Sequence, residues 1–168
     1  AAAAALPTEA LDWQAIVTDA AQEAVPRALA VGIDLGFELQ PTPLPGQRFL
    51  LRELLANLLH NALAYAGRGA QVTVRCRPEG GWAVLEVEDN GPGIAADERE
   101  AVFQRFRRGR AATAASGAAS EGSGLGLAIV RDIALGHGGE VELCDGAGGR
   151  GLCVRVRLPS VAAAPPAA

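Results

Sequence analysis

The sequence predicts a two-layer α+β sandwich, in which helices cover one face of a sheet that is built mainly from hairpins. Apolar residues recur at helical spacing in three segments and alternate in five others. Four of the five alternating segments come as adjacent pairs joined by turn residues, which favours antiparallel hairpins over the parallel crossovers of a doubly wound fold.

The first third of the chain predicts a helix followed by a strand. Residues 11–31 place Leu11, Ala15, Ile16 and Ala20 at helical spacing, and Pro26 is expected to kink or split that helix. Residues 33–39 (IDLGFEL) alternate as a strand does. The prolines in residues 41–45 predict a break in regular structure.

The remaining elements follow from the same patterns. Residues 47–65 form a leucine-rich helical pattern, which glycines soon after it should end. Residues 71–77 and 82–88 predict a hairpin with a turn at 78–81. A short helix near 97–106, a long loop over 107–123, a helix over 125–135 and a final hairpin of 140–144 with 152–158 complete the expected order.

Composition limits the classes of function. With 168 residues, 49% of them hydrophobic and 20% charged, the chain suits a single packed domain, which we place at 10–159 between a linker (1–9) and a tail (160–168) without fixed structure. The net charge of −4 argues against a nucleic-acid partner. All 15 basic residues are arginine, which excludes a P-loop with its phosphate-binding lysine.

The remaining composition points to a cytoplasmic domain. Cys76, Cys144 and Cys153 form no C-x-x-C pair, so we expect reduced thiols, and the two distant histidines, His60 and His137, make a zinc site improbable. The sequence has neither an 18-residue apolar run nor a signal-peptide pattern, so we expect this segment to make no membrane contact.

Three polar clusters carry the candidate chemistry. On the helix over 47–65, Glu53, Asn57, Asn61 and Ala64 share one stripe. Asparagine is a poor helix former, so two of them one turn apart predict oxygen ligands for Mg²⁺ and its phosphates, with a solvated helix face as the alternative.

The other two clusters contain glycine. Residues 89–94 (DNGPGI) place a carboxylate at a strand end before glycines, which suits a ligand with amine donors; a plain turn is the alternative. Residues 122–127 (GSGLGL) open a helix, where free N–H groups and the helix dipole favour phosphate. Their G-x-G-x-G spacing differs from the dinucleotide pattern G-x-G-x-x-G.

The order and spacing of these clusters resemble those of the GHKL ATPases, and within them of the sensor histidine kinases. Residues 53–65 (ELLANLLHNALAY) resemble the N box, 89–94 the G1 box, 102–109 (VFQRFRRG) the F box that marks histidine kinases, and 122–130 (GSGLGLAIV) the G2 box. The resemblance covers about residues 10–159. It implies the Bergerat ATP-binding fold, with a mixed, mostly antiparallel sheet of about five strands on three helices.

The resemblance also implies a role for each matching residue. Asp89 would accept a hydrogen bond from the adenine amine, Asn61 would coordinate Mg²⁺ and Asn57 would lie near the metal or the phosphates. Glu53 would have a supporting role in catalysis, while Tyr65 would cover adenine or ribose unless it is a core aromatic. The 107–123 segment would be an ATP lid without fixed structure in the absence of nucleotide. The remaining nucleotide contacts implied are Gly91, Gly93, Ile94, Arg108, Arg110, Gly122, Ser123, Gly124, Leu125 and Gly126.

The chain departs from the family pattern in two places. Ala64 stands where the N box often has lysine, and Leu152 stands where the last hairpin often has threonine. Both histidines lack the H-E-x-x-x-P context of a phosphoacceptor. The resemblance therefore implies a domain that binds MgATP and phosphorylates a histidine on a separate dimerisation domain.

The resemblance extends to partners. The dimerisation domain of the same protein would be the direct partner and a response regulator an indirect one. This segment would be monomeric when isolated, and its parent a homodimer anchored in the bacterial inner membrane. The alternatives are a GHKL-type ATPase that hydrolyses ATP and a non-catalytic nucleotide-binding module.

Overall fold

The computed structural model describes residues 8–92, 97 and 125–161. Its helices are α1 (Trp13–Ala30), α2 (Arg48–Tyr65) and α4 (Leu125–Gly136), with a short 3-10 turn, η3, at Ala147–Gly149. Its strands are β1 (Glu9–Asp12), β2 (Asp34–Leu39), β3 (Pro43–Gly46), β4 (Gln71–Glu79), β5 (Trp82–Asp89), β6 (Glu140–Asp145) and β7 (Leu152–Pro159). No helix in these ranges is long and apolar enough to cross a bilayer.

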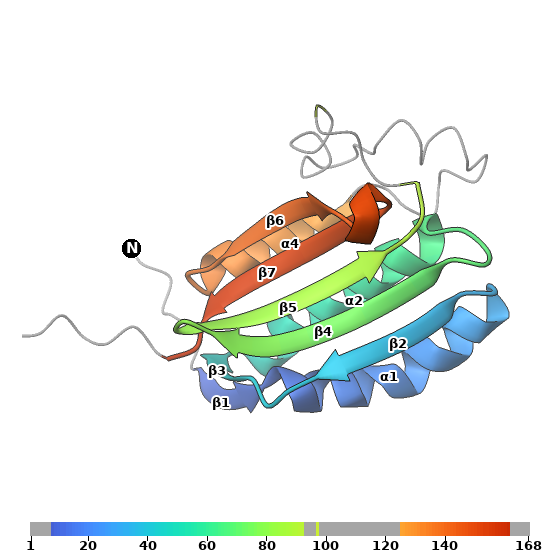
Figure 1. Ribbon diagram of the computed structural model, residues 1–168. Coiled ribbons are helices and arrows are strands. Elements are labelled where there is room, and N and C mark those ends of the chain that lie inside the picture. The colour runs from blue at the N-terminus through green and yellow to red at the C-terminus, as the bar shows by residue number, and fades with distance from the viewer. Residues whose placement is uncertain (1–7, 93–96, 98–124, 162–168) are drawn as a thin grey trace, which may run out of the picture.

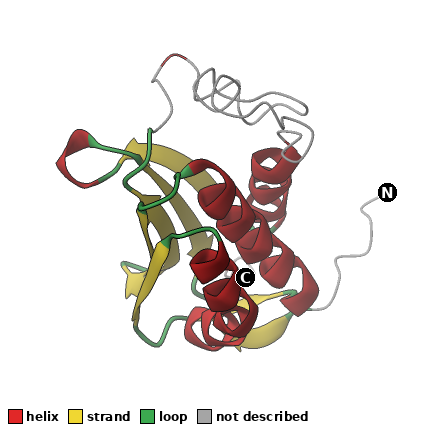
Figure 2. Cartoon of the chain, turned by 90° about the vertical axis from the view of Figure 1, so that its right-hand side faces the viewer, coloured by secondary structure: helices red, strands yellow, loops and turns green. Residues whose placement is uncertain are grey.

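The main sheet has five strands in the order β2-β4-β5-β7-β6. Strands β2 and β4 are parallel, and the other three pairs are antiparallel. Figure 1 shows α1, α2 and α4 behind this sheet, and Figure 2 shows the two layers from the side. The predicted two-layer α+β sandwich with a mixed five-stranded sheet is confirmed.

The core lies between the sheet and the helices. Alternate residues of each central strand point at the helices, and a stripe of leucines on α2 meets them. Each fully buried aliphatic side chain contributes about 1.5–3 kcal/mol relative to an exposed one. The largest fully buried side chains in this core are Trp13, Leu51, Leu54, Leu55, Leu58, Leu85, Leu158, Val17, Val72, Val74 and Val130.

The other face of the sheet carries alternating charges. Glu86, in the middle of β5, is only 5% exposed although it is ionisable. Its carboxylate lies 2.6 Å from Arg155 Nε, 3.1 Å from Arg77 Nη1 and 3.9 Å from Arg75 Nη1. These pairs join β4, β5 and β7 through their side chains, in addition to the backbone ladder.

The prolines of residues 41–45 do not break regular structure as predicted. Pro43 to Gly46 form β3, which pairs antiparallel with β1 in a separate two-stranded sheet. Proline is tolerated there because a strand in a two-stranded ribbon has one edge that needs no donor. Asp12 anchors the ribbon, since its Oδ1 accepts hydrogen bonds from Gln14 N and Thr42 N, each at 2.8 Å.

Two other local expectations change. Helix α1 continues through Pro26, which is exposed, so water can hydrogen-bond the carbonyl group that proline leaves without an N–H partner. The turn predicted at 78–81 shrinks to Gly80 and Gly81, because β4 extends to Glu79. Both glycines have positive φ, as the tightest hairpin turns require.

Candidate nucleotide-binding site

The asparagine stripe of α2 faces the start of α4. A Cβ atom built on Gly126 would lie 3.0 Å from Asn61 Nδ2, 3.2 Å from Asn61 Oδ1 and 3.4 Å from Asn57 Oδ1. Both asparagines are half-buried. The structure therefore brings together three predicted site residues from clusters that lie more than 60 residues apart in the sequence.

The amide of Asn57 is oriented by its own helix. Its Nδ2 donates to the backbone carbonyl of Glu53 at 2.8 Å, which leaves Oδ1 as the available acceptor near Gly126. Such local bonds weaken a helix, so their presence at this position needs another reason than helix stability. An amide oxygen held in this way is a suitable ligand for a hard cation.

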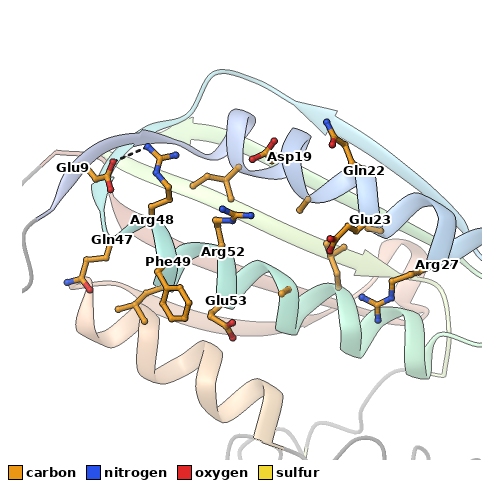
Figure 3. A pocket seen from close by; sticks show the side chains of 16 residues that line it. Glu9, Asp19, Gln22, Glu23, Arg27, Gln47, Arg48, Phe49, Arg52 and Glu53 are labelled. Carbon is orange, nitrogen blue, oxygen red and sulfur yellow. Dashed lines mark hydrogen bonds and ion pairs between the residues drawn. The ribbon is translucent and has the colours of Figure 1, made fainter.

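The Glu53 side chain also borders a separate groove. It is exposed and lines a groove of about 1180 Å³ between α1 and α2, together with Arg52, Glu23 and Arg27 (Figure 3). The groove's lining contains neither the two asparagines nor Asp89. Among the site residues that the structure describes, Glu53 is the one that also lines this groove.

Asp89 ends β5 and is half-buried. Burial raises the pKa of its carboxyl group, while hydrogen bonds from the backbone amides of Gly91 and Leu152 act in the opposite direction. The Gly91 N–H donates to Oδ1 at 2.9 Å. A hydrogen bond from a ligand's N–H group stabilises a desolvated carboxylate more than it stabilises an exposed carboxylate. Asp89 is therefore suited to recognise an amine on a ligand.

Glycines let the loops around Asp89 approach one another closely. A Cβ on Gly91 would lie 2.5 Å from the carbonyl oxygen of Ala66, so the loop after β5 packs on the end of α2. Gly151 has a φ of +76°, and a Cβ there would overlap the Asp89 carbonyl oxygen. Sequence reasoning missed this role of Gly151, although the run of glycines before β7 is a signal for a tight approach.

The two departures from the family pattern occupy different surroundings. Ala64 is exposed on α2. Leu152 pairs in register with Asp89, and its backbone amide supplies one of the hydrogen bonds to the Asp89 carboxylate. Leucine and threonine have the same backbone amide, so this hydrogen bond to Asp89 does not depend on which of the two stands at position 152.

The other predicted site residues are only partly placed. Tyr65 is the last residue of α2 and half-buried, and Leu125 begins α4. The helix expected near 97–106, the F box, the lid over 107–123 and seven site residues fall almost wholly beyond the part of the chain that the structure describes. Those seven are Gly93, Ile94, Arg108, Arg110, Gly122, Ser123 and Gly124.

The donor set fits a magnesium nucleotide. Asn57 and Asn61 offer neutral amide oxygens beside the N-terminal turn of a helix, and Mg²⁺ bound through few protein ligands also uses the phosphate oxygens of its nucleotide. Asp89 offers a carboxylate acceptor near the end of α2, through the Gly91–Ala66 contact. In the described ranges no group of three or more His, Cys, Asp or Glu residues is placed to hold a metal ion.

Comparison with known proteins agrees with this geometry. Residues 46–162 match the family model described as histidine kinase-, DNA gyrase B-, and HSP90-like ATPase. This match covers more than half of the chain, including α2, β5 and α4. The chain belongs to this family of ATPases. Within the family it is an ATP-binding domain of the histidine kinase type, as the relatives below show.

The relatives are sensor kinases. Over 155 residues the chain is 38% identical to the sensor protein kinase PmrB of Pseudomonas aeruginosa, covering 90% of this chain and 31% of PmrB. It is 41% identical over 117 residues to the sensor-like histidine kinase SenX3 of Mycobacterium bovis, covering 69% of this chain and 27% of SenX3. The chain thus spans about a third or less of these relatives.

Solved structures share the fold. The mycobacterial sensor histidine kinase MprB superposes with a TM-score of 0.76 at 32% identity, covering 90% of this chain and 97% of that one. Full-length ShkA, solved in complex with AMPPNP, superposes with a TM-score of 0.78 at 28% identity, covering 99% of this chain and 34% of that one.

Proposed function

We propose that this chain is the catalytic domain of a sensor histidine kinase, which binds MgATP and donates the γ-phosphoryl group to a histidine on a separate dimerisation domain. The observation that carries the proposal is the closeness of the Asn57 and Asn61 amides to Gly126, because it places two candidate oxygen ligands for Mg²⁺ beside a helix start that suits phosphate. The identity to sensor kinases supports the same reaction.

Each described site residue has a defined task in this proposal. Asp89 accepts a hydrogen bond from the adenine amine, and Gly91 keeps its loop close to α2. Asn61 and Asn57 hold Mg²⁺, which when bound neutralises charge on the phosphates. Tyr65 covers the adenine or ribose, Gly126 and Leu125 begin the phosphate-binding helix, and Glu53 supports catalysis from the edge of the site.

The remaining tasks stay predictions from the sequence. Gly93 and Ile94 would complete the adenine contact, Gly122, Ser123 and Gly124 would cradle phosphate, and Arg108 with Arg110 would contact the γ-phosphate. In the transfer, an imidazole nitrogen of the partner forms the new P–N bond while the bond from the γ-phosphorus to the bridging oxygen breaks. The products are ADP and a phosphohistidine. Phosphoryl transfer depends mainly on positioning and charge neutralisation, which is what this set of residues offers.

The parent protein would supply the rest of the system. We place the catalytic domain at 10–159, with the dimerisation domain of the same protein as its direct partner and a response regulator as the final acceptor. The isolated domain would be monomeric, and the parent a homodimer anchored in the inner membrane with this domain in the cytoplasm.

Transfer to a supplied phosphoacceptor domain tests the proposal. The chain, the parent's dimerisation domain and γ-labelled ATP are incubated together, and label on the dimerisation domain is measured with its acid and base stability. We expect acid-labile label that decreases at least about tenfold with Asn61→Ala, because lost metal ligands typically cost that much. Release of inorganic phosphate without labelled protein would instead support a GHKL-type ATPase and contradict the kinase proposal.

A further inference from the structure

His137 joins α4 to the start of α2, a contact to which none of the site residues contributes. Its Nδ1 lies 2.8 Å from the carbonyl oxygen of Ile133, and its Nε2 lies 3.2 Å from the backbone nitrogen of Gln47. A carbonyl can only accept and an N–H can only donate, so Nδ1 carries the proton and Nε2 is the acceptor. The ring is therefore neutral when both bonds form.

The start of α2 has few other ways to satisfy its backbone. Gln47 is the N-cap residue of α2, and its side chain makes no capping hydrogen bond. Its Oε1 is buried and has no hydrogen-bond partner among the described residues. Because the first amides of a helix lack partners within the helix, His137 supplies an acceptor that this cap otherwise lacks.

The neighbouring backbone leaves room for the ring. A Cβ on Gly46 would lie 3.3 Å from both Cδ2 and Nε2 of His137, and 2.9 Å from Leu51 Cδ1. A larger residue at position 46 would therefore press on the imidazole. Gly46 and His137 form one fitted contact between two elements that are 90 residues apart in the sequence.

This contact and the site lie at opposite ends of the same pair of helices. Helices α2 and α4 pack side by side behind the sheet (Figure 1). From Gln47 to Asn57 the chain rises about 15 Å along α2, and from Gly126 to His137 it rises about 16 Å along α4. The two lengths match, so antiparallel α2 and α4 meet at one end through His137 and at the other through Gly126.

We propose that His137 is a positioning residue that fixes how far α4 lies along α2, and thereby holds Gly126 against Asn57 and Asn61 for nucleotide binding. The inference rests on the proposed nucleotide site. The bond from Gln47 to His137 joins the two helices, and the bond of His137 to Ile133 holds the imidazole in place on α4. Together with the close fit at Gly46 they restrain sliding of α4 along α2, which would change the close spacing of Gly126 from the asparagine amides at the other end.

Two substitutions separate the role of Nε2 from that of Nδ1. In His137→Asn the shorter amide can still donate to Ile133 but cannot reach Gln47. In His137→Gln the longer side chain places an amide oxygen near the position of Nε2, so it retains the acceptor. We measure ADP affinity by calorimetry at a temperature where all three proteins are folded. The free energy of unfolding and the NMR shifts of the Gly126 amide and the Asn57 and Asn61 side-chain amides are measured in parallel.

We expect His137→Asn to bind ADP about three- to tenfold more weakly, the range that one lost hydrogen bond supports. The Gly126, Asn57 and Asn61 signals should shift in His137→Asn and return in His137→Gln, together with the affinity. Wild-type affinity in a destabilised His137→Asn protein would show a purely local role and overturn the inference. Equal weakening in both variants would also overturn it, and absence of ADP binding by the wild type would overturn the proposed nucleotide site as well.

Discussion

Gly126 shows how much of the candidate site depends on a missing side chain. The amide atoms of Asn61 and Asn57 lie where the β-carbon of any other residue would press on them. The sequence identified both the asparagine stripe and the glycine-rich helix start, because each has a local pattern. It could not show that they touch, since that contact depends on how α2 and α4 pack.

Gly126→Ala therefore separates stability from binding. Alanine favours a helix over glycine by about 1 kcal/mol, so we expect little change or a small gain in the free energy of unfolding. The new methyl group should displace the Asn61 amide and weaken MgATP binding about tenfold or more. Urea titration and calorimetry check the two effects. An unchanged affinity would show that Gly126 does not border the nucleotide.

Asp89 shows at the residue scale that a binding group can lower the stability of the empty domain. Burial raises the pKa of its carboxyl group, so folding favours the protonated form, and this contribution to stability is present below the unfolded pKa and lost as pH rises through the folded value. At neutral pH and above, the ionised side chain is therefore a cost to the empty domain. Asp89→Asn should leave the free energy of unfolding unchanged or slightly raised, so that a loss of nucleotide affinity in this variant can be assigned to the site and not to unfolding.

At the scale of elements, strands and helices with clear periodicity were predictable, and those without it were not. The leucine stripe fixed α2, and alternation fixed β4, β5 and β7. The β1–β3 ribbon was missed because two of the four residues in β3 are prolines, and only its partner strand and Asp12 explain it. The role of His137 also has no local pattern, because its partner Gln47 lies 90 residues away in the sequence and is brought close only by the packing of α4 on α2.

The outer face of the sheet carries an element-scale prediction at Glu86. Burial raises its pKa, but hydrogen bonds and charges from Arg77 and Arg155 outweigh burial and lower it below the ordinary value. Glu86→Gln should lower the free energy of unfolding at neutral pH by about 1–3 kcal/mol, because the half-buried guanidinium groups of Arg77 and Arg155 lose the charge of a buried carboxylate.

The pH dependence gives the sign of this effect. A carboxyl group with a lowered folded pKa contributes stability above its unfolded pKa, and this is lost as pH falls through the folded value. The wild-type advantage over Glu86→Gln should therefore shrink below the ordinary glutamate pKa of 4.5. Glu142, whose side chain is 45% exposed and also pairs with Arg155 at 3.4 Å, is the control, and Glu142→Gln should change stability by less than about 0.5 kcal/mol. Equal effects of both substitutions in urea titrations would contradict the buried network.

At the scale of the molecule, the core that stabilises the fold and the residues of the candidate nucleotide site lie in different regions. The sheet and its leucine-rich core hold α2 and α4 rigidly, and the candidate site occupies the end of this layer where α2, β5 and α4 meet. The chain offers groups for the nucleotide and no histidine in a phosphoacceptor context. This division suits a catalytic domain that acts on a histidine outside this chain, and the match spans only 31% of PmrB and 27% of SenX3.

Calorimetric titration of MgATP into the wild-type domain and into Asp89→Asn tests the central claim most directly. We predict wild-type binding in the micromolar to sub-millimolar range, about −5 to −8 kcal/mol, with competition by ADP. Asp89→Asn should remain folded and lose at least about tenfold in affinity. An amide has only one acceptor oxygen, and its N–H₂ group cannot accept a hydrogen bond from the adenine amine. Absence of heat and of ADP competition in the wild type, or equal affinity in Asp89→Asn, would contradict the claim that this domain binds ATP through Asp89.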